Sequence, residues 1–214
     1  MDWLVMLKKL LPLILCYFCL GSSWASQLPV LSGVGGDFSA VDQNNQSMKL
    51  SDYKGKVIVL AFGYTNCADI CPFTLGYLKG LYEALTNEEQ KQMQVLFVTI
   101  DPQYDTPNHL KDFIAYFNKN FIGISGDISQ IDKVVNLFQA EYHTLSDFSI
   151  GTKDMRRVNP KKDIDVEKDK ALLYTHSVTI YLMDKKLRVR SLEYTGTPRA
   201  VFSKKIRQLL DEES

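Results

Sequence analysis

The chain has 214 residues, enough for one domain with a substantial buried core. It carries 25 basic and 25 acidic residues, so its formal net charge is zero. We therefore do not expect it to bind nucleic acid, which requires a surface with an excess of positive charge.

The first 25 residues have the pattern of an export signal. Lys8 and Lys9 precede an apolar run over residues 10–20, and small residues follow up to Ala25. The run is shorter than the roughly 20 residues that a membrane-spanning helix needs. We expect residues 1–25 to be a signal peptide, cleaved after Ala25, or a membrane anchor.

Export would place residues 26–214 in the periplasm or on the outer face of an inner membrane. The domain would be soluble there, or held at the membrane only through an uncleaved N-terminal segment. Such a compartment is oxidising, so a free pair of thiols tends to form a disulfide unless a metal or a thiol reductant intervenes. Cys16 and Cys19 lie inside the apolar run and are expected to be apolar filler.

The mature part begins with strand signals. Residues 35–41 and 46–50 flank the polar turn 42–45, which indicates a β-hairpin. The unbroken apolar run 57–62 is typical of a strand that is buried on both faces.

A helix is expected after Pro72, and residues 87–90 end or interrupt it. Its apolar residues recur at helical spacing: Phe73, Leu75, Leu78, Leu81, Tyr82 and Leu85. A second buried strand follows over residues 95–100. Thr106 and Pro107 then form a helix start, with the threonine as N-cap and the proline in the first turn.

The second half alternates in the same way. Residues 121–124 form a short strand at best, and residues 127–142 are expected to be a helix. The inner side of this helix would carry Ile128, Ile131, Val134, Val135, Leu137 and Phe138. The charged stretch 152–170 is expected to be a long exposed loop.

The chain ends with a hairpin and a helix. Residues 177–183 form the third strong strand, and the turn 184–186 leads into a strand within residues 187–194. Thr197 and Pro198 would cap a last helix whose inner face holds Val201, Ile206, Leu209 and Leu210. This order predicts one α/β domain with a central mixed sheet and helices on both faces.

Cys67 and Cys71 are the only cysteines after the leader, and they sit between the first buried strand and the helix that follows it. A helix N-terminus favours thiolate, which both disulfide exchange and metal binding require. Three residues separate the two cysteines, and positions i and i+4 share one face of a helix. This spacing favours a shared external ligand, although a disulfide between the two remains feasible.

Three histidines could complete a metal site. His109 and His143 are expected to be surface residues, or in the second case a helix C-terminal cap, whereas His176 stands directly before the strand 177–183. On position alone, His176 is equally well explained as a structural residue. Two thiolates with one imidazole suit Cu(I), while zinc requires four ligands or a bound water, so copper is the favoured metal.

Four motifs resemble the Sco/SenC family, the thioredoxin-fold copper proteins that serve cytochrome c oxidase assembly. They lie, in this order, at residues 36–57, 62–72, 98–106 and 175–182, and the resemblance covers residues 36–212. It implies a thioredoxin-like copper-binding domain that acts as a metallochaperone. A copper-accepting protein, such as an oxidase subunit, would be its partner.

The resemblance also implies which residues bind copper. Cys67, Cys71 and His176 match the metal ligands of the family, and Asp101 and Asp105 match acidic residues near the site. The two aspartates are equally well explained as turn and helix-cap acids. The chain departs from the family at three positions, Asn66, Ala68 and Thr175, where histidine, proline and aspartate are usual.

The alternative function is a thiol–disulfide oxidoreductase in which Cys67 and Cys71 are the redox-active catalytic pair. It would act on cysteines of exported proteins and need a thiol reductant. Ordinary thioredoxin-type reductases place a cis-proline before the strand that corresponds to residues 177–183. No proline lies between Pro160 and Pro198, and His176 takes that neighbourhood.

Overall fold

The computed structural model describes residues 27–144 and 174–213. The expected leader at residues 1–25 and the expected loop at 152–170 lie outside the described residues. Within the described part of the chain, no helix combines the length and the apolar character needed to cross a membrane.

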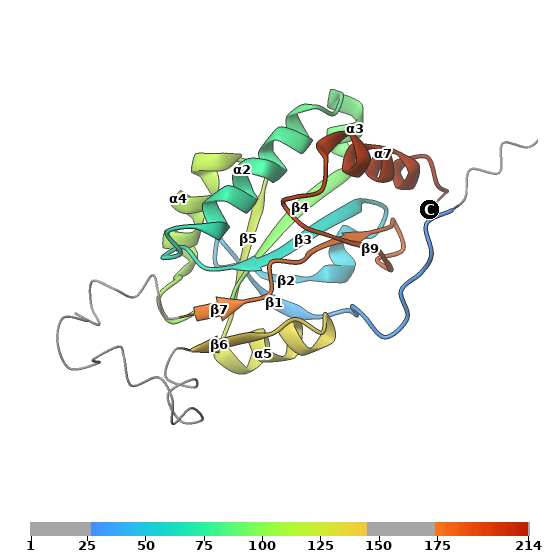
Figure 1. Ribbon diagram of the computed structural model, residues 1–214. Coiled ribbons are helices and arrows are strands. Elements are labelled where there is room, and N and C mark those ends of the chain that lie inside the picture. The colour runs from blue at the N-terminus through green and yellow to red at the C-terminus, as the bar shows by residue number, and fades with distance from the viewer. Residues whose placement is uncertain (1–26, 145–173, 214) are drawn as a thin grey trace, which may run out of the picture.

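A seven-stranded mixed sheet forms the centre of the domain (Figure 1), as predicted. Strands β3, β4 and β5 run parallel, and the remaining neighbours pair antiparallel. Across the sheet the strands are β2 (Ser47–Lys49), β1 (Ser39–Asp42), β5 (Ile122–Ser125), β4 (Met93–Thr99), β3 (Val57–Gly63), β8 (Ile180–Met183) and β9 (Val189–Glu193). A separate two-stranded sheet pairs β6 (Tyr142–Thr144) with β7 (Tyr174–His176).

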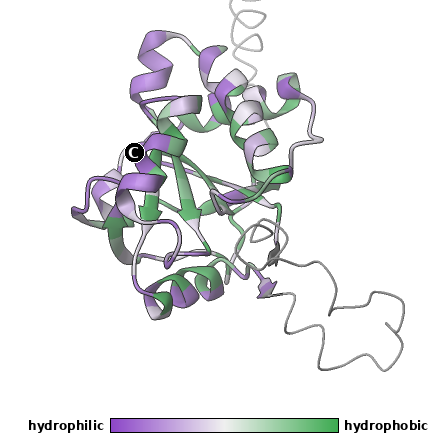
Figure 2. Cartoon of the chain, turned by 90° about the vertical axis from the view of Figure 1, so that its left-hand side faces the viewer, coloured by the Kyte–Doolittle hydropathy of each residue, from purple (hydrophilic) through white to green (hydrophobic). Residues whose placement is uncertain are grey.

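The burial of the two central strands, β3 and β4, explains their apolar sequences. Every residue of both is buried, because helices cover the sheet on both faces. In Figure 1, α2 and α7 lie on one side of the sheet and α5 on the other. Figure 2 shows the central strands as predominantly hydrophobic, while hydrophilic residues lie on the outer sides of the helices. The helices are η1 (Leu50–Tyr53), α2 (Ile70–Glu83), α3 (Asn87–Lys91), α4 (Pro107–Phe117), α5 (Ile128–Leu137) and α7 (Arg199–Leu210).

The helix expected over residues 127–142 ends early. Helix α5 stops at Leu137, and Gln139 adopts a left-handed backbone conformation with φ of 51°. A left-handed residue just after the last turn ends a helix, and it is usually a glycine or asparagine. The chain then enters β6, so the expectation of helix at Tyr142 was wrong.

Three finer expectations were also wrong. Ile128 and Val201, expected on inner helix faces, are 46% and 47% exposed. Thr197 does not cap α7, because the N-cap is Pro198 and the Thr197 hydroxyl donates instead to Glu193 at 3.1 Å. The predicted strand 177–183 is divided: β7 ends at His176 and β8 begins only at Ile180.

A buried arginine ties the start of the described chain to its end. Arg190, 3% exposed, pairs with Asp184 at 2.9 Å and with both carboxylate oxygens of Glu212. Its Nε also donates to the carbonyl oxygen of Leu28 at 2.9 Å. These groups lie where β8 ends and β9 begins, and Figure 1 shows both ends of the described chain on this side, away from β6 and β7. We call this group the Arg190 clamp.

Candidate metal centre

The two cysteines lie on a loop and on the helix that follows it. Strand β3 ends at Gly63 and α2 begins at Ile70, so Cys67 belongs to the loop and Cys71 to the first turn of the helix. The proposed reason for their convergence, positions i and i+4 of one helix, is therefore wrong. The fold of the loop turns Cys67 toward Cys71 instead, with Cys67 half-buried and Cys71 buried.

A buried carboxylate holds this loop. Asp105 is fully buried and accepts hydrogen bonds from the backbone N–H of Thr65 at 3.0 Å and from its hydroxyl at 2.5 Å. It also accepts one from the Thr99 hydroxyl at 2.5 Å, which joins the loop to the end of β4. Burial raises the pKa of Asp105 above its usual value. Asp105 therefore positions the cysteine loop and does not cap α4, where Thr106 is the N-cap.

Asp101 contributes through its backbone. Its carbonyl oxygen accepts the N–H of Asp105 at 2.8 Å, and its N–H donates to the Thr99 hydroxyl at 3.0 Å. The Asp101 carboxylate is not among the donor atoms that converge with the two sulfurs. Of the two aspartates, Asp105 is the one whose side chain bonds to the cysteine loop, and the supporting role expected for both stays a prediction.

His176 lies at the end of β7, which pairs with β6 and faces the cysteine loop across the site. Tyr142 and His176 are paired across the hairpin, and Ser177 continues the ladder by donating to the carbonyl oxygen of Glu141 at 2.9 Å. The Ser177 hydroxyl in turn accepts the N–H of Glu141 at 3.0 Å. His176 therefore stands at the end of a strand that hydrogen bonds hold in register.

The imidazole is oriented by two residues that the sequence analysis did not single out. Nδ1 lies 2.9 Å from the carbonyl oxygen of Ser177, and a carbonyl only accepts, so Nδ1 donates to it and Nε2 is the ring nitrogen that faces the sulfurs. The Tyr64 ring packs edge-on against the imidazole, with ring centroids 5.9 Å apart. A hydrogen bond that fixes the ring is the usual support of a metal-binding histidine. Here it comes from Ser177, so the missing aspartate at Thr175 does not leave the ring unsupported.

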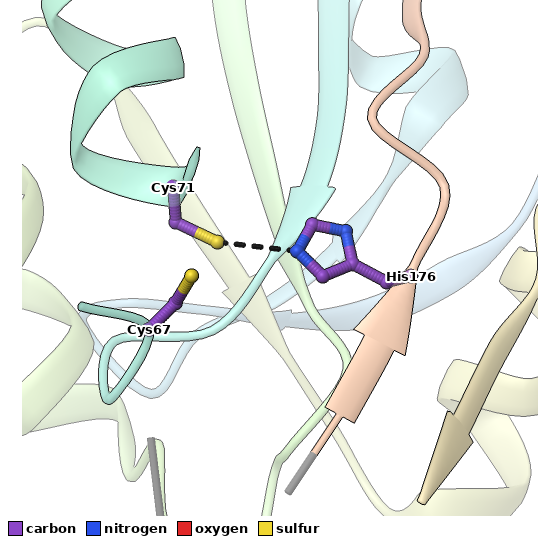
Figure 3. Close-up of side chains that lie close together, drawn as sticks. All are labelled: Cys67, Cys71 and His176. Carbon is purple, nitrogen blue, oxygen red and sulfur yellow. Dashed lines mark hydrogen bonds between the residues drawn. The ribbon is translucent and has the colours of Figure 1, made fainter. Parts of the chain in front are cut away.

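Three potential ligand atoms meet at one point (Figure 3). The two sulfurs and a ring nitrogen of His176 all lie within 4.8 Å of one another, and Nε2 is 3.3 Å from the sulfur of Cys71. At a metal–sulfur distance of about 2.3 Å, two sulfurs on one ion lie at most ~4.6 Å apart. The arrangement therefore fits a single ion with small side-chain adjustments.

The two thiols differ in protonation. Hydrogen bonds from the Cys71 thiol, from the His176 side chain and from the backbone N–H groups of Cys71 and Asp69 lower the pKa of Cys67 to about 3, against the opposing effect of burial. The hydrogen bond to Cys67 and burial raise the pKa of Cys71 far above its usual value. The reduced pair at neutral pH thus holds one thiolate, at Cys67, and one proton, at Cys71.

The other two histidines lie outside this cluster. His109 is exposed and packs against the ring of Tyr104, and His143 lies on β6 with its side chain exposed, where no helix end needs a cap. Within residues 27–144 and 174–213, Cys67, Cys71 and His176 are the one group of three metal-binding side chains that come this close together. Two thiolates and an imidazole are a soft donor set, which suits Cu(I) better than zinc.

Comparisons with known proteins agree with this site. The model of the SCO1/SenC family matches residues 28–211. A SCO2-like protein of Rickettsia felis is 34% identical over 71% of this chain and 64% of its own length. The protein sco1 of Schizosaccharomyces pombe is 30% identical over 71% of this chain and 51% of its own length. The chain therefore matches about half to two thirds of the length of these relatives.

Solved structures show the same fold. ScoI of Bradyrhizobium japonicum, described with copper bound, superposes with a TM-score of 0.67 at 26% identity, over 83% of this chain and 99% of that one. Yeast Sco1, also described with copper bound, gives a TM-score of 0.67 at 24% identity, over 85% of this chain and 91% of that one. These likenesses, with the mixed sheet flanked by helices, confirm the expected thioredoxin-like α/β fold.

Proposed function

Because the chain belongs to the SCO1/SenC family, we propose that it is a copper-binding metallochaperone. It holds one copper ion between Cys67, Cys71 and His176 and delivers the ion to an acceptor protein. The copper described in the structure of its Bradyrhizobium relative supports this proposal. The copper centre of cytochrome c oxidase is the acceptor that the family resemblance suggests.

One observation carries the proposal: two parts of the chain, 105 residues apart in the sequence, bring two sulfurs and an imidazole to one point. Cys67 comes from a loop held by Asp105, Cys71 from the first turn of α2, and His176 from the end of β7. A disulfide alone would not need the histidine, and a structural histidine would not need its second ring nitrogen beside a thiol.

The same groups account for release of the ion. An incoming thiolate of the acceptor bonds to Cu(I) as a protein sulfur leaves, so no change of oxidation state is needed. When Cys71 is released it takes up one proton, because its thiol form is strongly favoured, whereas Cys67 stays a thiolate. Cys67 is partly buried and Cys71 is buried, so Cys67 is the more exposed of the two cysteines.

We place this function in the periplasm or on the outer face of an inner membrane, from the export pattern of residues 1–25. There the thiols must be kept reduced before copper binds, which requires a thiol reductant.

The combination of a thiolate at Cys67 and a protonated thiol at Cys71 favours a second candidate function, thiol–disulfide exchange. The Cys67 thiolate attacks a disulfide of an exported protein, forms a mixed disulfide and releases one substrate thiol. Cys71 then loses its proton and displaces the second substrate thiol. The substrate is reduced, Cys67–Cys71 is oxidised, and the reductant resets the pair.

Anaerobic copper titration of the reduced full-length chain, with elemental analysis, tests the proposal. We expect about one copper per chain beyond that bound by the Cys67→Ser/Cys71→Ser double variant, which keeps Cys16 and Cys19. The His176→Ala variant should lose Cu(II) binding and keep part of its Cu(I) binding. Electron paramagnetic resonance measures the Cu(II) binding.

The matched control is His109→Ala, which removes an exposed histidine outside the cluster. It should bind both oxidation states like the wild type. Full copper retention by His176→Ala would contradict the three-ligand site. If that variant also reduced insulin disulfides at the wild-type rate, exchange would be the better description.

A further inference from the structure

The metal site lies at the edge of the sheet formed by the C-terminal ends of the central strands β3 and β4. Large apolar side chains are also exposed at this edge. Phe73 is 63% exposed, Val178 44% and Tyr104 38%. Phe73 lies two residues after Cys71, Val178 two residues after His176, and Tyr104 directly before Asp105. We call Phe73, Tyr104 and Val178 the apolar rim.

The sheet topology brings these residues to one edge. Strand β3 runs parallel to β4 with Gly63 beside Thr99, so the loops after both strands leave the sheet together. Strand β8 is antiparallel to β3 with Ile180 beside Ala61, so the segment before β8 arrives at the same edge. Hydrogen bonds join two of these segments, from Ile100 to Gly63 at 2.9 Å and from Thr65 to Asp105 at 3.0 Å.

Among the described residues, the loops at this edge carry acidic side chains and neither lysine nor arginine. Asp69 is exposed and Asp101 is partly exposed, whereas Asp105 is buried, and neither lysine nor arginine occurs between Lys56 and Lys79. The same holds from Gln92 to Leu110, and from Tyr174 to Asp184 within the described residues. In the described part of the chain, these loops therefore surround the sulfurs with apolar side chains, and Asp69 and Asp101 are their charged groups at the surface.

Helix α2 leaves room beside Phe73. A methyl group added at Gly76, one turn further on, would meet no atom within 4 Å. A glycine inside a helix destabilises it relative to alanine, so packing within the described domain does not account for this residue. The helix thus presents an aromatic ring next to a bare stretch of backbone, which another protein could approach closely.

We propose that the apolar rim is the docking surface for the protein that receives the metal, and that this acceptor presents an apolar face bordered by lysine or arginine next to its own thiols. The proposal rests on the proposed function. Ligand exchange requires donor and acceptor sulfurs to bind the same ion, and Cys71 is buried, so the two proteins must be in contact at this edge. Apolar contact supplies affinity, and the acidic groups at this edge select partners of opposite charge.

The experiment follows Cu(I) transfer from the loaded full-length chain to three synthetic peptides. All three share one dithiol core of equal copper affinity, and their flanks are apolar with lysine, apolar with glutamate, or serine with lysine. The wild type should transfer fastest to the apolar peptide with lysine. Its preference over the glutamate peptide should shrink at about 1 M salt, where charges are screened within about 3 Å.

Phe73→Ser should slow transfer to the apolar lysine peptide by about tenfold, the loss expected for one central apolar contact. Val178→Ser should slow it in the same direction. The matched control is Tyr116→Ser, which removes an aromatic ring that is 84% exposed near the far end of α4. It should change the rate less than about twofold. Transfer to a small neutral chelator should be the same for all variants.

Equal rates for Phe73→Ser, Val178→Ser and the wild type would overturn the docking surface while leaving copper binding intact. So would equal rates to the serine and apolar peptides. A dimer in sedimentation that Phe73→Ser dissociates would assign the rim to a second copy of the chain instead. If the wild type holds no copper beyond the cysteine double variant, the proposed function fails, and the docking surface fails with it.

Discussion

At the scale of single residues, the two site cysteines have the same side chain and opposite proton affinities. Cys67 accepts hydrogen bonds from its surroundings, whereas Cys71 is buried and donates to Cys67. A nucleophile and a protonated partner are therefore separated by the environment of each sulfur. This difference gives the reduced protein a measurable signature even without metal.

We predict that iodoacetamide labels Cys67 first, at a rate that stays nearly constant between pH 5 and pH 8. A pKa of about 3 leaves Cys67 fully ionised throughout that range, whereas an ordinary thiol would gain about tenfold in rate per pH unit. Peptide mapping by mass spectrometry of the reduced chain measures the labelling. Cys16 and Cys19, in the same chain, provide internal comparisons.

The same difference sets the sign of the pH dependence of copper binding. Binding must displace the Cys71 proton, so the affinity for Cu(I) should fall by about tenfold for each unit by which pH decreases between 8 and 5. Chelator competition at several pH values measures it. A pH-independent affinity would show that Cys71 is not protonated in the free protein.

The sequence identified the three candidate ligands because residue type and motif order carry that information. It did not identify Tyr64 or Ser177, which orient the imidazole. A backbone carbonyl has no sequence signature, and a ring contact between Tyr64 and His176 depends on how β3 and β8 pair. Asp105 was a candidate from its motif, but its bond to Thr65 required the fold.

At the scale of the elements, the end of β3 controls the space available to the site. A methyl group added at Gly63 would lie 2.7 Å from the Phe97 ring and 2.8 Å from the sulfur of Cys71. Real contacts of this kind are essentially never so short, so the ring or the sulfur would have to move. The absence of a side chain at Gly63 is what allows Cys71 to reach its position.

We predict that Gly63→Ala lowers the free energy of unfolding by about 1–3 kcal/mol, the usual cost of overpacking, and weakens copper binding. The matched control is Gly76→Ala within α2, where the new methyl group meets nothing within 4 Å. That change should stabilise the protein by about 0.5–1 kcal/mol, because alanine is the better helix former. Urea denaturation measures both. Equal stability of Gly63→Ala and the wild type would contradict the crowding.

The end of α5 shows why one boundary escaped prediction. Apolar residues continue at helical spacing as far as Tyr142, so periodicity alone extends the helix. The helix ends instead through the left-handed backbone at Gln139, a residue type that gives little warning of it. The same error hid β6, and with it the hairpin that carries His176.

At the scale of the whole molecule, alternating strands and helices were enough to predict one α/β domain with a mixed sheet. The strand order was not predictable, because β1 pairs with β5 and β3 with β8 across long separations in sequence. Those pairings depend on packing between distant segments, and they place the cysteine loop beside the segment that follows His176.

The Arg190 clamp should contribute to the stability of the whole domain. We predict that Arg190→Ala lowers the free energy of unfolding by about 3 kcal/mol, because it leaves the buried carboxylate of Asp184 without one of its partners. The matched control is Arg207→Ala. Its pair with Glu89 is exposed and screened by solvent, so less than about 1 kcal/mol should be lost. Urea denaturation of both variants checks this, and copper stoichiometry should be unchanged.

The clamp also determines where the N-terminal end of the described chain lies relative to the metal site. It grips Leu28 at the end of the sheet where β8 finishes, whereas His176 and the cysteines lie at the end where β3 finishes, roughly 20 Å away along a seven-residue strand. Anything attached ahead of residue 27 therefore joins the domain at the pole opposite the sulfurs. In a chain tethered to a bilayer by its first residues, the copper would point outward, toward approaching proteins and away from the lipid.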